Sequence, residues 1–198
     1  MTIIGITGPT GAGKTTALNE LEKLGGAIID CDAVYHEMLE SDIALQSELE
    51  QAFGPLKNEM GTFDRKKLGG VVFRDPAALE RLNRIVWPHI ERAVDERIER
   101  ARQQGRTCAA VDGITIIESG RAAKCDTTVA VLAPVEDRVR RICLREGISE
   151  EYARARVSAQ KQDEWFWANC EHILMNDCAG VEEFALKAKT LFEQILNP

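Results

Sequence analysis

A short stretch near the N-terminus combines glycines, a lysine and a hydroxyl at a spacing that suits the binding of a phosphate chain. Residues Gly8–Thr15 fit the pattern G-x-x-x-x-G-K-[S/T] at every position. Glycines allow backbone conformations that are closed to other residues, so successive N–H groups can point at one anion. The sequence therefore predicts a loop that binds a nucleoside triphosphate. The predicted contacts are Gly8, Gly11, Ala12, Gly13, Lys14, Thr15 and Thr16.

The side chains at the end of this loop add a positive charge and a metal ligand. Lys14 can reach the β- and γ-phosphates of ATP, and the hydroxyl of Thr15 can ligate Mg²⁺. This chemistry requires a strand before the loop and a helix after it. The apolar run Ile3–Ile6 and the helical segment Thr16–Leu24 supply both. ATP and Mg²⁺ are therefore the expected co-substrate and cofactor.

Acidic residues stand at the ends of later apolar runs. Asp30 and Asp32 follow the run 27–29, and Asp112 follows the run 108–111. Because ligands of open α/β sheets bind beyond the carboxyl ends of the strands, all of these carboxylates are site candidates. Asp112 is predicted to orient Mg²⁺, the alternative being a turn cap. Of Asp30 and Asp32, one can cap the next helix (Ala33–Leu39) while the other faces the site, and the spacing leaves the choice open.

Arginines are dense between residues 138 and 156. Gly147 is typical of a helix end and Ser149 of a helix start, so the segment is predicted to form two helices. Arginines on a helical hairpin near a phosphate site can neutralise the charge that develops on a transferred phosphoryl group. We expect a lid that closes over ATP; the alternative is a solvated basic surface. The arginines are Arg138, Arg140, Arg141, Arg145, Arg154 and Arg156.

The remaining elements give the fold class. Further strands are predicted at 127–133 and 172–176, which makes a parallel five-stranded α/β sheet flanked by helices. Only helices are expected between the second and third strands, at Ala44–Phe53, Arg65–Phe73 and Pro76–Gln104, and an amphipathic helix (Val181–Leu196) closes the chain. We expect a single domain (1–198) with its core at about 1–40, 106–134 and 170–198. A helical acceptor-binding insertion is expected at about 41–105 and the lid at about 135–169, where Trp165, Phe166 and Trp167 are expected to pack between lid and core.

Composition and residue spacing argue against a nucleic-acid partner, a membrane span and a metal site built from cysteine and histidine. A net charge of −7 over 198 residues disfavours a nucleic-acid partner. No apolar run approaches the ~20 residues that span a bilayer, and no signal peptide is recognised, so we expect a cytoplasmic protein without a membrane partner. The six cysteines and three histidines show no metal-ligand spacing. The oligomeric state is not predicted.

A short chain with this loop, one helical insertion and an arginine lid is typical of a small-molecule kinase; it has no Asn-Lys-x-Asp pattern for guanine. Over positions 4 to about 196 the sequence resembles the dephospho-CoA kinase family. The matching segments are Gly26–Ala33, Thr62–Leu68, Val72–Phe73, Leu82–Pro88, Asp112, Glu118–Gly120, Arg141, Arg145–Glu151, Ala155–Arg156, Ala159–Gln160 and Asn176. The chain departs from the family pattern at Trp87 (usually His), Ile114 (Pro), Arg138 (Gln) and Cys170–Glu171 (Ala-Asp).

The resemblance implies transfer of the γ-phosphoryl group of ATP to the 3′-hydroxyl of dephospho-CoA. It implies that Asp32 is the general base, and that Lys14 and Arg141 or Arg140 stabilise the transferred group. It also implies that Arg145 and Asn176 contact the nucleotide. Two other functions stay open: a kinase for a nucleoside or nucleotide, and an ATP-binding regulatory protein that has lost phosphoryl transfer.

Overall fold

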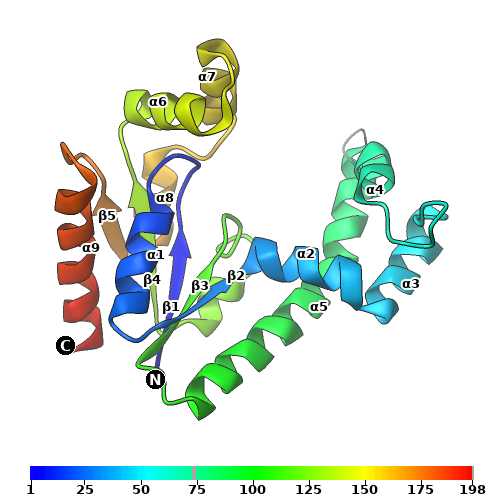
Figure 1. The fold of residues 1–198 in the computed structure, drawn as a ribbon, viewed down its shortest axis with the longest axis horizontal. Coiled ribbons are helices and arrows are strands. Elements are labelled where there is room, and N and C mark those ends of the chain that lie inside the picture. The colour runs from blue at the N-terminus through cyan, green and yellow to red at the C-terminus, as the bar shows by residue number, and fades with distance from the viewer. Residues whose placement is uncertain (73–74, 198) are drawn as a thin grey trace. The chain divides into compact units, whose positions relative to one another are not determined.

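The computed structural model describes residues 1–72 and 75–197 and divides the chain into two compact units (Figure 1). The first unit comprises Met1–Ile29 with Ile98–Pro198, and the second comprises Asp30–Arg97. The second unit thus starts at Asp30, ahead of the predicted insertion at about 41. Phe73, the expected last residue of a helix and part of one matching segment, lies outside the described residues. No helix in the described part of the chain is long and apolar enough to cross a membrane.

A five-stranded sheet forms the centre of the first unit. The strands are β1 (Thr2–Thr7), β2 (Ala27–Asp30), β3 (Cys108–Asp112), β4 (Thr127–Leu132) and β5 (His172–Met175), in the order β2-β3-β1-β4-β5. β1 pairs in parallel with both β3 and β4, and β4 with β5. The predicted fold class is confirmed. Because β1 is the middle strand, the loop that follows it emerges at the centre of the sheet edge.

Alternate strand residues divide the core between the faces of the sheet, as the period of two requires. On one face, Ile4, Val129 and Val131 pack against α1 (Lys14–Lys23) and α9 (Val181–Leu196). On the other, Ala130 and Leu132 pack against the buried Phe166 of α8 (Asp163–Asn169). A short 3₁₀ helix, η1 (Arg121–Lys124), precedes β4. The prediction that Trp167 packs inside is wrong, since it is 53% exposed.

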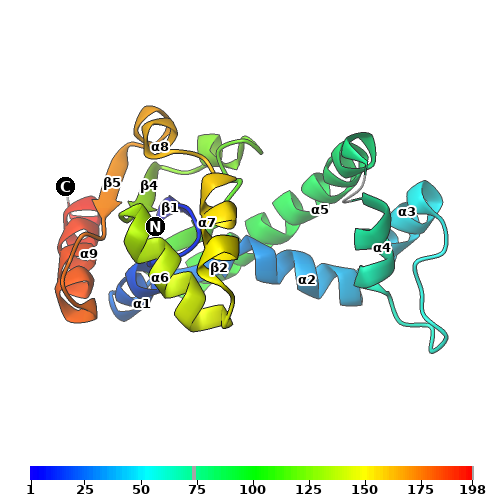
Figure 2. The ribbon, with the colours of Figure 1, turned by 90° about the horizontal axis from the view of Figure 1, so that it is seen from above.

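The predicted lid is a pair of helices, α6 (Val135–Glu146) and α7 (Glu150–Ser158), which lie beyond the carboxyl ends of β1 and β4 (Figures 1 and 2). Gly147 ends α6 in the left-handed conformation (φ 65°), and the Ser149 side chain accepts a hydrogen bond from the Tyr152 N–H. The predicted helix end and helix start are thus confirmed. A small core of Val139, Ile142, Ala153 and Val157 joins the two helices.

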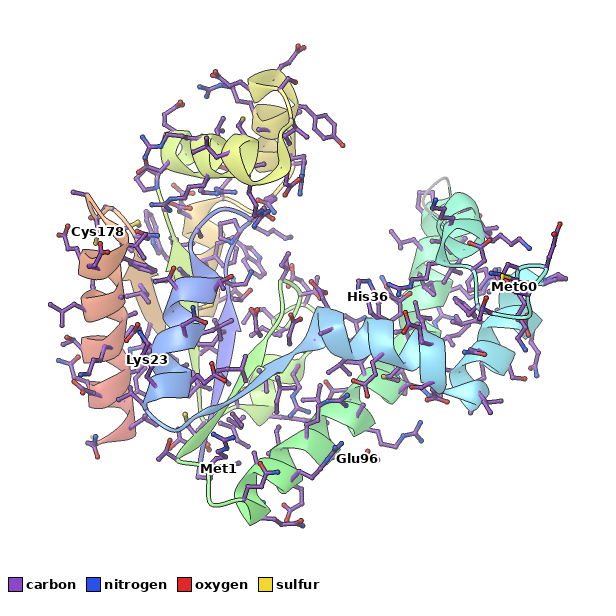
Figure 3. The ribbon with its side chains drawn as sticks, in the orientation of Figure 1. Met1, Lys23, His36, Met60, Glu96 and Cys178 are labelled. Carbon is purple, nitrogen blue, oxygen red and sulfur yellow. The ribbon has the colours of Figure 1, made fainter. Side chains whose placement is uncertain are left out.

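The second unit is helical, as predicted. It contains α2 (Cys31–Ser41), α3 (Ile43–Phe53), α4 (Arg65–Val72) and most of α5 (Pro76–Gln103), which continues into the first unit. The loop 54–64 joins α3 to α4, and Met60 extends from it, 88% exposed (Figure 3). Asp42 caps α3, and its carboxylate also contacts the buried His89 of α5. Trp87 lies half-buried on α5, directly before Pro88.

Helices α1 and α2 begin earlier than the sequence analysis predicts. α1 begins at Lys14 and α2 at Cys31, instead of at Thr16 and Ala33. The candidate residues Lys14, Thr15 and Asp32 therefore belong to first helical turns. This matters because the N–H groups of a first turn have no partner inside the helix and must find one elsewhere.

Candidate active site

The loop between β1 and α1 needs glycine for both conformation and space. Gly8, Gly11 and Gly13 have φ angles of 139°, 82° and 106°. A Cβ atom on Gly8 would lie 2.1 Å from the carbonyl oxygen of Val131, and one on Gly13 would lie 2.5 Å from Nδ2 of Asn176. Any larger residue would push the loop away from β4 and β5. The glycine pattern therefore sets how closely this loop lies against the sheet.

Side chains from other elements bind the carbonyl groups of the loop. Nε of Arg138 donates to Thr10 O (3.1 Å), and Nη1 of Arg141 donates to Gly11 O (3.2 Å). Nδ2 of Asn176 donates to Ala12 O (2.8 Å). Among the described residues, the N–H groups of Gly13, Lys14 and Thr15 have no hydrogen-bond acceptor. The loop thus offers donors to an incoming anion while its carbonyls are already satisfied.

Lys14 lies between the loop and the end of β3. Its Nζ atom is 3.4 Å from Gly8 O and 4.0 Å from Oδ1 of Asp112. Both side chains are largely buried, at 17% and 15% exposure. Thr15, the predicted metal ligand, is exposed, and Thr16 is half-buried. The structure therefore brings together the predicted phosphate-binding lysine and the predicted metal-orienting carboxylate.

Lid arginines complete a cavity of about 270 Å³ over the loop. It is lined by Pro9–Thr15, Arg141, Arg145 and Arg156. Arg140 does not line it; this side chain pairs with Asp137 at 2.6 Å on the exposed side of α6. Arg156 pairs with Glu146 across the lid and reaches the same cavity. The cavity therefore gathers cationic side chains from both lid helices.

Helical spacing distinguishes these arginines. Arg141 and Arg145 are four residues apart and share a face of α6, whereas Arg140 is one residue away and faces elsewhere. This signal was present in the sequence and favours Arg141 over Arg140. Arg156 stands on α7, and only the turn between the two helices brings it to the loop. Arg156 was predicted as one of the lid arginines and not as a site residue.

Asn176 supports the loop instead of lining the cavity. It is 5% exposed, and its amide holds Ala12 O from the end of β5. Because a Cβ on Gly13 would collide with the same amide, Asn176 and Gly13 fit each other. Its predicted contact with the nucleotide stays a prediction, and the contact that the structure gives is with the backbone of the loop.

The ambiguity between Asp30 and Asp32 is resolved within the second unit. Oδ1 of Asp30 accepts hydrogen bonds from the N–H groups of Asp32 (2.8 Å) and Ala33 (3.0 Å), so Asp30 is the cap of α2. Asp32 lies in the first turn with its side chain exposed. The Asp32 carboxylate is thus left available for chemistry.

Comparison with known proteins identifies the family. The family model described as dephospho-CoA kinase matches residues 2–182. The chain belongs to the dephospho-CoA kinase family. Proteins named dephospho-CoA kinase from Dehalococcoides mccartyi and Corynebacterium glutamicum are 34% and 32% identical to it, over 179 and 196 residues. The first alignment covers 90% of both chains, and the second covers 98% of this chain and 97% of its relative.

Solved structures share the fold of this chain. TT1252 from Thermus thermophilus is 29% identical with a TM-score of 0.83, covering 100% of this chain and 98% of that one. Shikimate kinase from Bacteroides thetaiotaomicron, 17% identical, has a TM-score of 0.56 and covers 97% of this chain and 98% of its own, a likeness of fold alone. The resemblance in the sequence is confirmed, and the protein is an ATP-dependent kinase.

Proposed function

We propose that this protein transfers the γ-phosphoryl group of ATP to the 3′-hydroxyl of dephospho-CoA. The observation that carries the proposal is the cavity over the loop, where backbone N–H groups and cationic side chains face one volume. Such an arrangement suits a triphosphate, because both kinds of group favour negative charge. The acceptor, dephospho-CoA, is inferred from membership of the dephospho-CoA kinase family.

On the nucleotide side, we assign Lys14 to the β- and γ-phosphates. Arg141 and Arg145 are assigned to the transferred group, because both line the cavity and Arg141 is held at the loop by Gly11 O. Preorganised cations stabilise the charge that spreads over the phosphoryl oxygens in the transition state. The resemblance implied either Arg141 or Arg140 for this role. Its pairing with Asp137 gives it a smaller role in this proposal.

Mg²⁺ fits the donors available beside the loop. The exposed hydroxyl of Thr15 and the Asp112 carboxylate, close to Lys14, would hold it. Among the described residues no cluster of three or more His, Cys, Asp or Glu could hold a metal by itself. This agrees with an ion that takes most of its ligands from phosphates and water. When bound, Mg²⁺ would neutralise charge on the β- and γ-phosphate oxygens.

On the acceptor side, we assign Asp32 as the general base. Its carboxylate would take the proton of the 3′-hydroxyl as that oxygen bonds to the γ-phosphorus. The bond from phosphorus to the β–γ bridging oxygen then breaks, and ADP leaves. Asp30 is less suited to this role, because its Oδ1 already accepts two N–H groups at the start of α2.

The second unit also carries a groove suited to an acceptor with phosphates. It is about 610 Å³ and is lined by residues of the loop 54–64 and the adjoining helices, including Asn58, Arg65 and Lys66. Arg65 pairs with Glu40 at its rim. Cationic and amide donors of this kind bind phosphate oxygens. We propose that the predicted acceptor-binding role of this helical segment resides here.

An acceptor panel tests the proposed function. ADP release would be measured with ATP and Mg²⁺ against dephospho-CoA, nucleosides and nucleoside monophosphates, with Lys14→Ala as the inactive control. Turnover with dephospho-CoA, and 3′-phosphorylation of the product, would support the proposal. Faster turnover of a nucleoside or nucleotide would replace it with the first alternative. ATP binding without turnover of any acceptor would favour the regulatory alternative. A cytoplasmic location stays a prediction.

A further inference from the structure

Arg138 differs from the other lid arginines because it is buried. It stands in the first turn of α6 and is 3% exposed, whereas Arg140, Arg145 and Arg154 are exposed. Taking a guanidinium out of water is unfavourable unless hydrogen bonds and charge offset the loss. Burial lowers the pKa of Arg138, and the nearby Asp163 carboxylate opposes that shift. The hydrogen bonds that Arg138 makes must therefore offset the cost of its burial.

Those contacts converge on one residue of the phosphate loop. Arg138 donates from Nε to Thr10 O (3.1 Å) and from Nη2 to Oε1 of Gln160 (2.6 Å). Gln160 in turn accepts from the Thr10 N–H (3.2 Å) and donates from Nε2 to Thr10 Oγ1 (2.9 Å). The N–H, the carbonyl and the hydroxyl of Thr10 are thus all engaged. We call these three residues the Thr10 node.

The Thr10 node joins both ends of the lid to the loop. Arg138 belongs to the first turn of α6, and Gln160 follows the end of α7 at Ser158. A Cβ on Gly11 would lie 2.9 Å from Arg138 O, so the loop and α6 also approach each other backbone to backbone. The lid is therefore held to the loop where it leaves the sheet and where it returns.

The consequence concerns Arg141, which is three residues after Arg138 on the same helix. Residues at this spacing share a face. Arg141 reaches Gly11 O and Ala12 O only while α6 keeps its position against the loop. Side chains thus bind the successive loop carbonyls of Thr10, Gly11 and Ala12. Two of these side chains depend for their position on α6, and the third depends on the end of β5.

We propose that Arg138 is a positioning residue, which acts through Thr10 and Gln160 to align the phosphate loop and the Arg141 guanidinium on the same phosphate group. It need not touch ATP. The inference rests on the proposed function for its kinetic part, since phosphoryl transfer is what misalignment would slow. A misplacement of about 1 Å can cost up to ~100-fold in rate.

Arg138→Met tests this, because methionine keeps an unbranched apolar stem and removes the hydrogen bonds. We expect kcat to fall roughly 10- to 100-fold, with a rise in the Kd for ATP measured by calorimetry. The control is Arg154→Met on α7, whose exposed pairs with Glu136 and Glu150 lie outside the cavity. Its kinetics should stay within about twofold of the parent.

A double variant separates positioning from general support of the fold. If Arg138 acts through Arg141, then Arg138→Met costs much less kcat when Arg141→Ala is already present. A purely structural role predicts a lowered Tm with independent, multiplicative losses. Multiplicative losses, or an Arg138→Met protein with kcat and ATP Kd within about twofold of the parent, would overturn the proposal.

A second variant and a binding measurement cover the cases in which the first variant does not fold or the parent is inactive. If Arg138→Met does not fold, Thr10→Val removes the hydroxyl from the Thr10 node without disturbing a buried charge, and the same comparison with Arg141→Ala is made. If the parent protein does not turn over dephospho-CoA, the proposed function fails. The Kd for ATP then decides the inference alone: an unchanged value in Arg138→Met refutes it, and a weaker one that Arg154→Met does not share supports it.

Discussion

The starts of α1 and α2 make an informative comparison, because each helix follows a strand of the same sheet. Gly13 precedes α1 and supplies no side-chain cap, and the first turn contains no acidic residue. Asp30 precedes α2 and caps two N–H groups, and Asp32 adds a second carboxylate to the first turn. The start of α1 is thus available to an external anion, whereas the start of α2 already binds the Asp30 carboxylate.

The difference shows how the same backbone feature, a helix start, can serve substrate groups of different charge. Every helix start carries N–H groups and a positive dipole end, which favour negative charge. At α1 those groups are available to phosphate, and Lys14 strengthens the field. At α2 the Asp30 carboxylate has satisfied two of them, so an incoming phosphate gains less there. Asp32, exposed in the same turn, is the residue that we propose accepts a proton from a neutral hydroxyl.

The largest expected effect follows from exchanging the carboxylates at the start of α2. Asp32→Asn should lower kcat by roughly 10²- to 10⁴-fold, because it removes the proposed general base. ATP affinity should be unchanged, since Asp32 is not a loop residue. Asp30→Asn should keep most of the activity, because Asn caps a helix about as well as Asp. Steady-state ADP release and ATP calorimetry on both variants make the measurement.

Equal losses in the two variants would contradict this division of roles. Both residues would then contribute to positioning α2 as a whole. Parent-like turnover in Asp32→Asn would remove Asp32 from the mechanism and leave the acceptor hydroxyl without an assigned base.

A smaller effect distinguishes the arginines that extend the open start of α1. Arg141→Ala should lower kcat by roughly 10- to 1000-fold, as the loss of one preorganised donor to the transition state does, and should weaken ATP binding less. Arg140→Ala should stay within about twofold, since its partner Asp137 lies on the exposed side of α6. Single-turnover kinetics at saturating ATP give the comparison. A larger loss in Arg140→Ala would show that the lid rearranges when ATP binds.

The sequence predicted best where one local pattern has one physical solution. The segment Gly8–Thr15 needs its glycines for positive φ and close approach, and that need is written in consecutive residues. Gly147 and Ser149 likewise predicted the turn between the lid helices, because glycine is typical of a helix end and serine of a helix start. The end of the last helix at Leu196 was likewise found from its period.

Prediction was weakest where chemically equal residues compete. Asp30 and Asp32 are both able to cap a helix, and only the backbone geometry assigns the cap to Asp30. Arg138 was grouped with the lid charges, because the sequence does not show that its guanidinium is buried against Thr10. Trp167 was placed inside from its type, although its helix directs Phe166 to the sheet. These assignments depend on contacts between residues far apart in the chain.

The smallest expected effect concerns α3, a third helix start, which is capped as α2 is. Burial opposes ionisation of Asp42, but hydrogen bonds from the Leu45 N–H and from His89 outweigh it and lower its pKa. Glu48 and Arg92 also face His89, at 3.2 and 3.0 Å from its ring. Because the folded pKa of Asp42 lies below the unfolded one, its contribution is complete above about pH 4 and is lost as the pH falls further.

Asp42→Asn isolates this contribution, since Asn keeps the cap but cannot ionise. We expect the variant to be less stable than the parent at pH 7, by less than about 1 kcal/mol because the carboxylate is partly exposed. Urea unfolding followed by circular dichroism at pH 7 and near pH 3 should show that difference shrinking in acid, where the parent loses its charge. A difference that grows on acidification would mean that Asp42 ionises less readily in the folded protein than in the unfolded chain. The start of α3 would then be stabilised only by hydrogen bonds to a neutral carboxyl group. It would differ from the uncapped start of α1 in geometry and not in charge.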